Sequence, residues 1–253
     1  MAGQLLNPYL RQKKCYYPVF AIGEEVSFYI NFNQPSTVDA SQLRLCLYKD
    51  DTIISDNIGV INSDLVGEDS ITGYELYNYY AKFICPEVTP GIYEMIIYNY
   101  VTNKTLLVSN SIEIMQPEQA NEVTQQIEYS NVSKIYNFMY DSGFTNKFRL
   151  HIFEEDRQYE TEVKQYRPVT TGKIRNIRTT SDRILTLETY YFDEEAHEAA
   201  AAMFIHSDIF ISGIKVEPRT AYKITPRDRI RNVNKGQIEV VDVNYSMINK
   251  FQS

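Results

Sequence analysis

The chain has 253 residues, 43% of them hydrophobic, and a formal net charge of -8. This length suffices for one large or two ordinary domains, and the hydrophobic fraction excludes a chain that is disordered throughout. The negative charge disfavours a general nucleic-acid-binding protein, because contacts between phosphates and Lys or Arg supply most of that affinity. The first 146 residues carry 8 Lys and Arg against 17 Asp and Glu, whereas residues 147–253 carry 17 against 16. This uneven distribution predicts two modules with different neighbours.

The sequence contains no pattern that predicts export, membrane insertion or metal binding by cysteines. No apolar run near the N-terminus suits a signal peptide, and none approaches the roughly 18 apolar residues of a membrane span. Cys15, Cys46 and Cys85 are far apart and form no CxxC motif, which predicts free thiols rather than disulfides or a zinc site. We therefore expect a protein without cofactor, metal or membrane span that is made in a reducing cytoplasm.

Residues 1–17 are predicted to form an N-terminal arm. Asn7 and Pro8, followed by RQKK at 11–14, break any regular periodicity. Such an arm is either frayed or ordered by a partner. Tyr9 and Arg11 are its candidate contact residues.

Residues 18–115 show the alternation that is typical of half-buried β-strands. In EEVSFYINF, residues 24–32, every second residue is apolar, and QLRLCLY, residues 42–48, repeats the pattern. Further strands are predicted at 74–84, 91–99 and 111–115, and the turn sequences NQPS, KDD, VTPG and VTNK separate strands along this region. Short strands with regular turn signals over about a hundred residues predict an immunoglobulin-like β-sandwich.

Residues 116–146 are predicted to be a connector, and residues 147–253 a small α+β domain. The connector is polar at first, and its second part has helical spacing, so we expect a short helix or an irregular bridge. The second domain is predicted to contain strands at 147–153, 171–178, 182–192, 208–218, 221–226 and 237–247. The acidic EED at 154–156 predicts a turn between two strands rather than a catalytic carboxylate pair. The fold class expected for the whole chain is thus mainly β with an α+β C-terminal part.

One alanine-rich helix is predicted in DEEAHEAAAAMFIHSD, residues 193–208. Asp193 suits the N-cap, and positions 196, 199, 200, 203 and 204 form the apolar stripe of a packing helix. His197 begins a pattern like the HExxH of zinc hydrolases, but the position of the second histidine is Ala201. His206 lies about half a turn off that face, so the two imidazoles are predicted to point to opposite sides. We therefore expect a packing helix, and a metal-dependent hydrolase remains the less favoured alternative.

The strongest electrostatic feature is the basic stretch 215–235. It contains seven cations against Glu217 and Asp228. The ordinary interpretation is a solvated loop, and the functional one is a contact with an acidic neighbour, such as the first module of another copy. The candidate interface residues in this stretch are Arg219, Arg227, Arg229, Arg231 and Lys235.

The segment VTPGIYEMIIYNYVTNKTLLVSNSIEIM, residues 88–115, resembles the closing strands of bacterial and phage Ig-like domains. Its Pro-Gly turn leads to a tyrosine-bearing strand, a polar hairpin and a last strand. The abundance of Tyr, Asn and Ile and the absence of Trp resemble virion proteins of tailed phages of Bacteroidales, including the crAss-like phages. The stretch GQIEVVDVNYSMINKF, residues 236–251, is similar to a terminal strand of tail-ring or tail-completion proteins.

This resemblance implies a non-enzymatic virion protein, a ring-forming subunit of the tail or neck around the DNA channel. The implied partners are further copies in a homo-oligomeric ring and neighbouring tail, portal or ring proteins, with no sequence-specific nucleic acid. No catalytic residue follows from it, because such proteins act by assembly. The alternative hypothesis is an Ig-like binding module that recognises a glycan or protein on a cell surface through exposed tyrosines.

Overall fold

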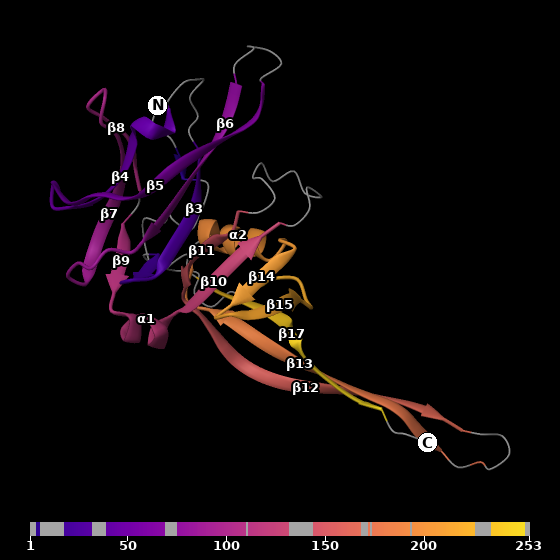
Figure 1. Ribbon diagram of the computed structural model, residues 1–253. Coiled ribbons are helices and arrows are strands. Elements are labelled where there is room, and N and C mark those ends of the chain that lie inside the picture. The colour runs from indigo at the N-terminus through magenta and orange to yellow at the C-terminus, as the bar shows by residue number, and fades with distance from the viewer. Residues whose placement is uncertain are drawn as a thin grey trace.

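A computed structural model shows that the chain is mainly β, with two α-helices among the residues that it describes (Figure 1). The described residues are 4–5, 18–31, 39–68, 75–109, 111–131, 144–167, 172, 174–192, 194–225 and 234–250. The sequence-based prediction of a mainly β protein is confirmed. No helix in this described part is long and apolar enough to cross a membrane.

The first half of the chain consists of short strands whose apolar residues face inward at every second position. Their bounds are β1 Gln4–Leu5, β2 Val19–Ala21, β3 Glu25–Asn31, β4 Leu43–Lys49, β5 Thr52–Glu68, β6 Glu75–Ile84, β7 Gly91–Asn99, β8 Lys104–Val108 and β9 Ile112–Met115, with a 3-10 turn η2 at Ala40–Gln42. The predicted strands at 24–32, 42–48, 74–84, 91–99 and 111–115 agree with β3, β4, β6, β7 and β9. The KDD turn is also present, since Asp50 and Asp51 both adopt positive φ between β4 and β5.

Hydrogen-bonded pairs connect these strands into a closed circuit. β3 pairs with β6, β6 with β5, β5 with β4, β4 with β7, and β7 with β9, all antiparallel. β9 then pairs in parallel with β2, which continues through a short turn into β3. Part of the predicted N-terminal arm is ordered within the chain, because β1 pairs with the end of β3.

The second half adds two helices and eight strands in the described residues. Their bounds are α1 Pro117–Val123, β10 Gln125–Ser130, β11 Asn146–Leu150, β12 Ile152–Tyr166, β13 Arg175–Thr189, α2 Glu194–Met203, β14 Asp208–Ile211, β15 Ile214–Pro218, β16 Lys223–Thr225 and β17 Lys235–Lys250. In the second half, β10 pairs with β11, and the chain continues from β11 through His151 into β12. β12 pairs with β13, β13 with β17, β17 with β15, β15 with β14, and β14 with β10, which completes a second circuit. β16 pairs with the start of β17.

The two circuits share hydrogen bonds and one hydrophobic core. β11 pairs with β2 through Arg149 and Val19, and with β3 through Lys147 and Ser27. A single cluster of buried residues extends from Phe20 and Phe28 in the first half to Phe192 and Val240 in the second. The body of the molecule is therefore continuous across the boundary between the halves.

Three strands leave this body as a long arm (Figure 1). We call the arm the projecting parts of β12 (Arg157–Tyr166), β13 (Arg175–Arg183) and β17 (Ser246–Lys250), which pair with one another in that order. Side chains of β12 are exposed from Glu154 to Tyr166 on both faces of the strand. The arm thus has no core of its own along β12.

The structure corrects four local expectations. The strand predicted at 208–218 is a hairpin of β14 and β15, which turns at Ser212 and Gly213. EED at 154–156 is not a turn: it lies within β12, where the register with β13 shifts between Glu154 and Asp156 as in a β-bulge. The two strands predicted between 171 and 192 are one strand, β13. Within the predicted connector, α1 and β10 are regular elements, and β10 is a member of the second circuit. The helical spacing seen after residue 131 falls on residues 132–143, outside the described residues.

Candidate functional site

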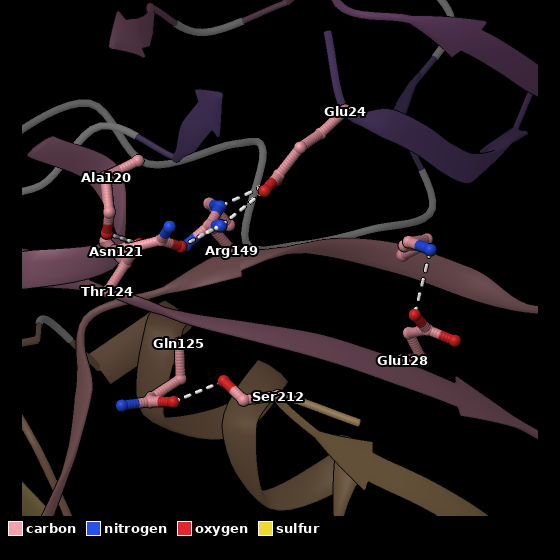
Figure 2. A network of polar contacts seen from close by, with 9 residues as sticks. Glu24, Ala120, Asn121, Thr124, Gln125, Glu128, Arg149 and Ser212 are labelled. Atoms are coloured by element: carbon pink, nitrogen blue, oxygen red, sulfur yellow. Dashed lines mark hydrogen bonds and ion pairs between the residues drawn. The ribbon is translucent and has the colours of Figure 1, made fainter. Parts of the chain in front are cut away.

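A network of polar side chains lies where the two halves of the chain meet (Figure 2). Its centre is Arg149 of β11, of which only 4% is exposed. The guanidinium Nε donates to Glu24 Oε2 at 2.7 Å, and Nη2 donates to Glu24 Oε1. Nη2 also donates to Asn121 Oδ1 at 2.6 Å, and Nη1 to Thr124 Oγ1 at 3.2 Å. One cation therefore joins three segments that are distant in the sequence.

Local sequence features place each partner of Arg149. Gly23, with a φ of 79°, allows the tight turn between β2 and β3 that presents Glu24. Pro117 starts α1, because a proline at the first helical position loses no hydrogen bond. Thr124 ends α1, and its hydroxyl donates to Ala120 O at 2.6 Å, which leaves the Oγ1 lone pairs to accept from Arg149.

The geometry is that of a buried fork-to-fork ion pair. Such a pair fixes orientation as well as distance, because two parallel N–H···O bonds tolerate little rotation. Because the guanidinium is buried, each hydrogen bond that it fails to form lowers the free energy of unfolding. The fold is therefore most stable when Glu24, Asn121 and Thr124 all contact Arg149. The network therefore holds the turn after β2, the end of α1 and β11 in one arrangement.

Further polar contacts extend this junction. Ser27 Oγ donates to Thr145 O at 2.6 Å, and Lys147 pairs with Glu128 at 2.9 Å. Beside them, Ser212 N donates to Gln126 O at 2.7 Å, and its hydroxyl donates to Gln125 Oε1. These bonds attach the residue before β11 to β3 of the first half, and they attach β10 to β11 and to the hairpin of β14 and β15.

Both faces of β12 are exposed in the arm. Side chains of a strand alternate, so Tyr159, Thr161 and Val163 share one face of β12, and Glu160, Glu162 and Lys164 share the other. Tyr159 is 55% exposed and Val163 is 41% exposed, and Arg183 stands opposite Tyr159 in the β12–β13 register. An exposed ribbon of this kind is only marginally stable by itself and is suited to contact with another molecule.

A second polar cluster holds the arm at its root. Arg183 forms an ion pair with Asp242, a carboxylate that is 1% exposed. Asp242 Oδ1 also accepts from the backbone N–H groups of Asn244 at 2.9 Å and Tyr245 at 3.2 Å. The Arg183 guanidinium lies 4.8 Å from the centre of the Tyr245 ring, where a cation–π contact is favourable. These contacts fix the direction in which the arm leaves the body.

Two of the predicted interface residues form ion pairs within the chain. Arg219 pairs with Glu160 of β12 at 3.1 Å, and Lys235 pairs with Glu188 of β13. The other candidates, Arg227, Arg229, Arg231, Tyr9 and Arg11, lie outside the described residues. The structure therefore places Arg219 against β12 and Lys235 against β13. The interface prediction for the remaining candidates stays a prediction.

The alanine-rich helix packs as predicted. Ala196, Ala200, Met203 and Phe204 are buried in the core cluster. His197 is buried too, with Nδ1 2.7 Å from Tyr222 Oη and Nε2 3.0 Å from Asn234 O. The expected N-cap, Asp193, lies outside the described residues.

The second histidine of the helix region has different neighbours. His206 Nδ1 lies 2.9 Å from Ala202 O, and its ring contacts Tyr129 at 4.5 Å between centroids. The two imidazoles thus have separate surroundings. In the described part of the chain, no group of three His, Cys, Asp or Glu side chains is placed to hold a metal ion.

The two described cysteines are poor nucleophiles. Burial raises the pKa of the Cys46 thiol and raises the pKa of Cys85 to about 12. Both thiols therefore stay protonated near neutral pH, and the thiolate is the reactive form. Neither residue supports covalent chemistry.

Two histidines, the half-buried His151 and the buried His206, are expected to make the stability of the protein depend on pH. Desolvation lowers the pKa of His151 and of His206 below the ordinary 6.5, so the unfolded chain binds protons more readily than the folded one. Above pH 6.5 both histidines are mainly neutral in the folded and in the unfolded chain, so they do not change the free energy of unfolding there. As the pH falls below 6.5, the unfolded chain takes up protons first, and the free energy of unfolding decreases. We expect the urea midpoint to fall between pH 7.5 and 5.5 more in the wild type than in His151→Gln/His206→Gln. Equal falls in both proteins would contradict this.

Sequence reasoning missed both the junction and the arm. Glu24 and Arg149 are 125 residues apart, and no local pattern links them. A signal for the arm is present in IFEEDRQYETEVKQY, residues 152–166, which is a long β pattern with no continuous apolar face. A strand without an apolar face is one that the body of the protein does not cover.

No protein-family model matches the chain, and a search of curated proteins finds no match.

Proposed function

We propose that this protein is a non-enzymatic structural subunit that assembles into a ring in the tail or neck of a phage virion, around the DNA channel. The observation that carries the proposal is the arm, whose strand β12 is exposed on both faces beyond the body. Such a ribbon buries too little surface to offset the entropy of ordering it alone. Contact with neighbouring copies supplies the missing surface.

A rigid body is the second requirement of a ring subunit, and the junction at Arg149 supports it. In a ring, each subunit presents two different surfaces related by a closing rotation. The relative position of these surfaces sets the number of copies, so a flexible connection between the halves would give open or irregular assemblies. A shared core and a buried ion pair fix the position of one half relative to the other.

We propose further that the first half is an Ig-like sandwich and the second half a small α+β unit. The pairing of β3 with β6, and of β4 with β7 and β7 with β9, follows the B–E and C–F–G pairings of that architecture. The second half combines its strands with the helices α1 and α2. The proposed partners are further copies and neighbouring tail, portal or ring proteins in the virion.

Removing the parts of β12 and β13 that lie beyond Glu160 and Asp182 is expected to abolish assembly without unfolding the body. Glu160 and Asp182 stand opposite each other in register, so an Asn-Gly turn can replace residues 161–181 and join them as a tight hairpin. Light scattering over a range of concentrations should show a discrete oligomer many times 29.5 kDa for the full chain and a monomer for the variant.

Circular dichroism is the control, since both proteins should have β spectra. A full chain that stays monomeric at every concentration would overturn the ring proposal and favour the Ig-like binding module. An arm-deleted variant that still forms the oligomer would show that the arm is not the contact.

A further inference from the structure

The outer edge of β12 has no neighbouring strand in the described part of the chain. β12 pairs with β13 from Ile152 to Tyr166, and none of the other described strands pairs with it. From Asp156 to Tyr166 the strand contains no extra residue, because the register shift after Lys164 places its extra residue in β13. The side chains from Glu154 onward are exposed. The arm therefore presents a regular strand edge that can pair with a strand of another molecule.

The sequence of this edge is complementary to itself. Residues 159–166 read YETEVKQY. When two copies of β12 lie antiparallel about a two-fold axis at Val163, Glu162 of each copy stands opposite Lys164 of the other. Opposite charges in directly opposed positions stabilise a pair of strands. The other opposed pairs from 160 to 166 contain at most one charged residue each, and they are Thr161 with Gln165 and Glu160 with Tyr166.

The neighbouring registers bring like charges together. An axis at Glu162 or at Lys164 places that residue opposite its own copy, and an axis at Thr161 places Glu160 opposite Glu162. Like charges in opposed positions destabilise a pair of strands. Charged residues on an exposed edge ordinarily prevent pairing with other strands, and here they leave the register at Val163 open.

The same register covers exposed apolar surface. Val163, which is 41% exposed, stands opposite Val163 of the other copy, on the face that it shares with Thr161 and Tyr159. Pairing also gives the backbone groups of both edges hydrogen-bond partners. Two arms of three strands each become one wider sheet, and a sheet gains stability from additional strands.

We propose that the β12 edges of two copies pair antiparallel about Val163 and join the two arms into one sheet. The contact is isologous, because both copies contribute the same residues. It goes beyond the proposed function, since it adds a two-fold contact to those that close a ring, and in the proposed ring the pair of copies is the unit that assembles. The self-complementary charges of the edge favour a second copy over a strand of an unrelated protein.

A single cysteine at the centre tests the pairing and its register together. On the two-fold axis a residue faces its own copy at a Cα separation of about 4.5–5.5 Å, within the range of a disulfide. In a Cys15→Ser background, we expect Val163→Cys to form a disulfide-linked dimer under mild oxidation at low protein concentration. A non-reducing gel measures it. Cys46 and Cys85 are buried and should not cross-link.

Thr161→Cys in the same background is the matched control. Thr161 is exposed on the same face of β12, but in the proposed register its own copy lies four residues along the strand, about 14 Å away. That separation is too large for a disulfide, so little dimer should form. A dimer of Thr161→Cys that equals or exceeds that of Val163→Cys would overturn the pairing. Absence of a dimer in both variants would overturn it too and leave the edge to a strand of a different protein.

Exchange of charge tests the pairs between Glu162 and Lys164. Glu162→Lys or Lys164→Glu replaces two opposite-charge pairs with two like-charge pairs, so each should weaken self-association about tenfold at low salt. The double variant Glu162→Lys/Lys164→Glu restores the pairs and should associate like the wild type. Light scattering measures the association, and undiminished association of both single variants would contradict the pairing.

Lys104→Glu is the control for net charge. Lys104 is exposed in β8, away from the arm, and its reversal changes the net charge as Lys164→Glu does. Association should stay as in the wild type. A loss equal to that of Lys164→Glu would show that net charge acts rather than the proposed contact, and it would overturn the pairing.

The proposed function and this inference can fail separately. A Val163→Cys dimer beside a full chain that forms nothing larger than two copies would support the pairing and overturn the ring. A large oligomer of the full chain in which neither cysteine variant cross-links would leave the ring proposal standing and overturn the pairing.

Discussion

Replacement of Arg149 by methionine is expected to lower the free energy of unfolding by about 3–4 kcal/mol, because it leaves Glu24 without its cation. Asn121 and Thr124 lose a donor in the same step. Glu24 keeps some access to water, with 25% of its side chain exposed, which holds the loss at the low end for a broken buried pair. For a chain of this size, the melting temperature should fall by about 6–16 °C.

The matched control is Arg157→Met. Arg157 also forms two hydrogen bonds to a glutamate, with Nε at 2.6 Å and Nη2 at 2.8 Å from the Glu154 carboxylate, but both side chains are exposed. Its melting temperature should equal that of the wild type, because water replaces the lost partner. Similar losses in the two variants would show that the junction is no more important than a surface ion pair. Arg149→Lys should recover only part of the stability, because an ammonium cannot form the fork.

Replacement of Phe83 by alanine is expected to cost about 3–5 kcal/mol and to shift one cooperative transition for the whole chain. Phe83 is 4% exposed, and its ring meets Phe20 and Phe28 edge to face, at 5.9 and 6.1 Å between centroids. Loss of the ring leaves a cavity beside Phe20 and Phe28 on the core face of the paired strands β3 and β6. The core cluster continues into the second half, so a defect in the first half should lower the stability of both.

Urea unfolding followed by far-UV circular dichroism and by tyrosine fluorescence measures this effect. The two probes should give the same midpoint in the wild type and in the variant. Phe153→Ala, at a half-buried site in β12, is the control and should cost less than half as much. Two separated transitions, of which only one responds to Phe83→Ala, would mean that the halves unfold independently.

The junction also defines how the proposed ring would transmit force between copies. The arm leaves from β12, β13 and β17 in the second half, whereas β5 and β6 belong to the first half. The halves are connected by the shared core, by the chain from β9 through α1 to β10, and by the path from β11 to β2 and β3. The buried fork of Arg149 lies on that path, and it restricts rotation of one half against the other.

The sequence by itself determined the strands and the helix that have one apolar face. The strands β3, β4 and β7 and the helix α2 were predicted because side chains that face a core repeat at the period of the local backbone. Turns with fixed chemistry were predictable for the same local reason, as KDD shows, since Asp tolerates the left-handed backbone that Asp50 and Asp51 adopt.

Tertiary structure alone decided the features on which the function is proposed. β10 reads as a polar connector, because only Ile127 and Tyr129 of its six residues are buried, and it becomes a strand through its neighbours β11 and β14. EED forms a bulge within β12 because β13 continues to pair on both sides of it. The partners of Arg149 come from 25 to 125 residues away, and such contacts leave no periodic trace in the sequence. Local backbone preference acts over a few residues. Pairing between distant strands forms only when the whole chain folds.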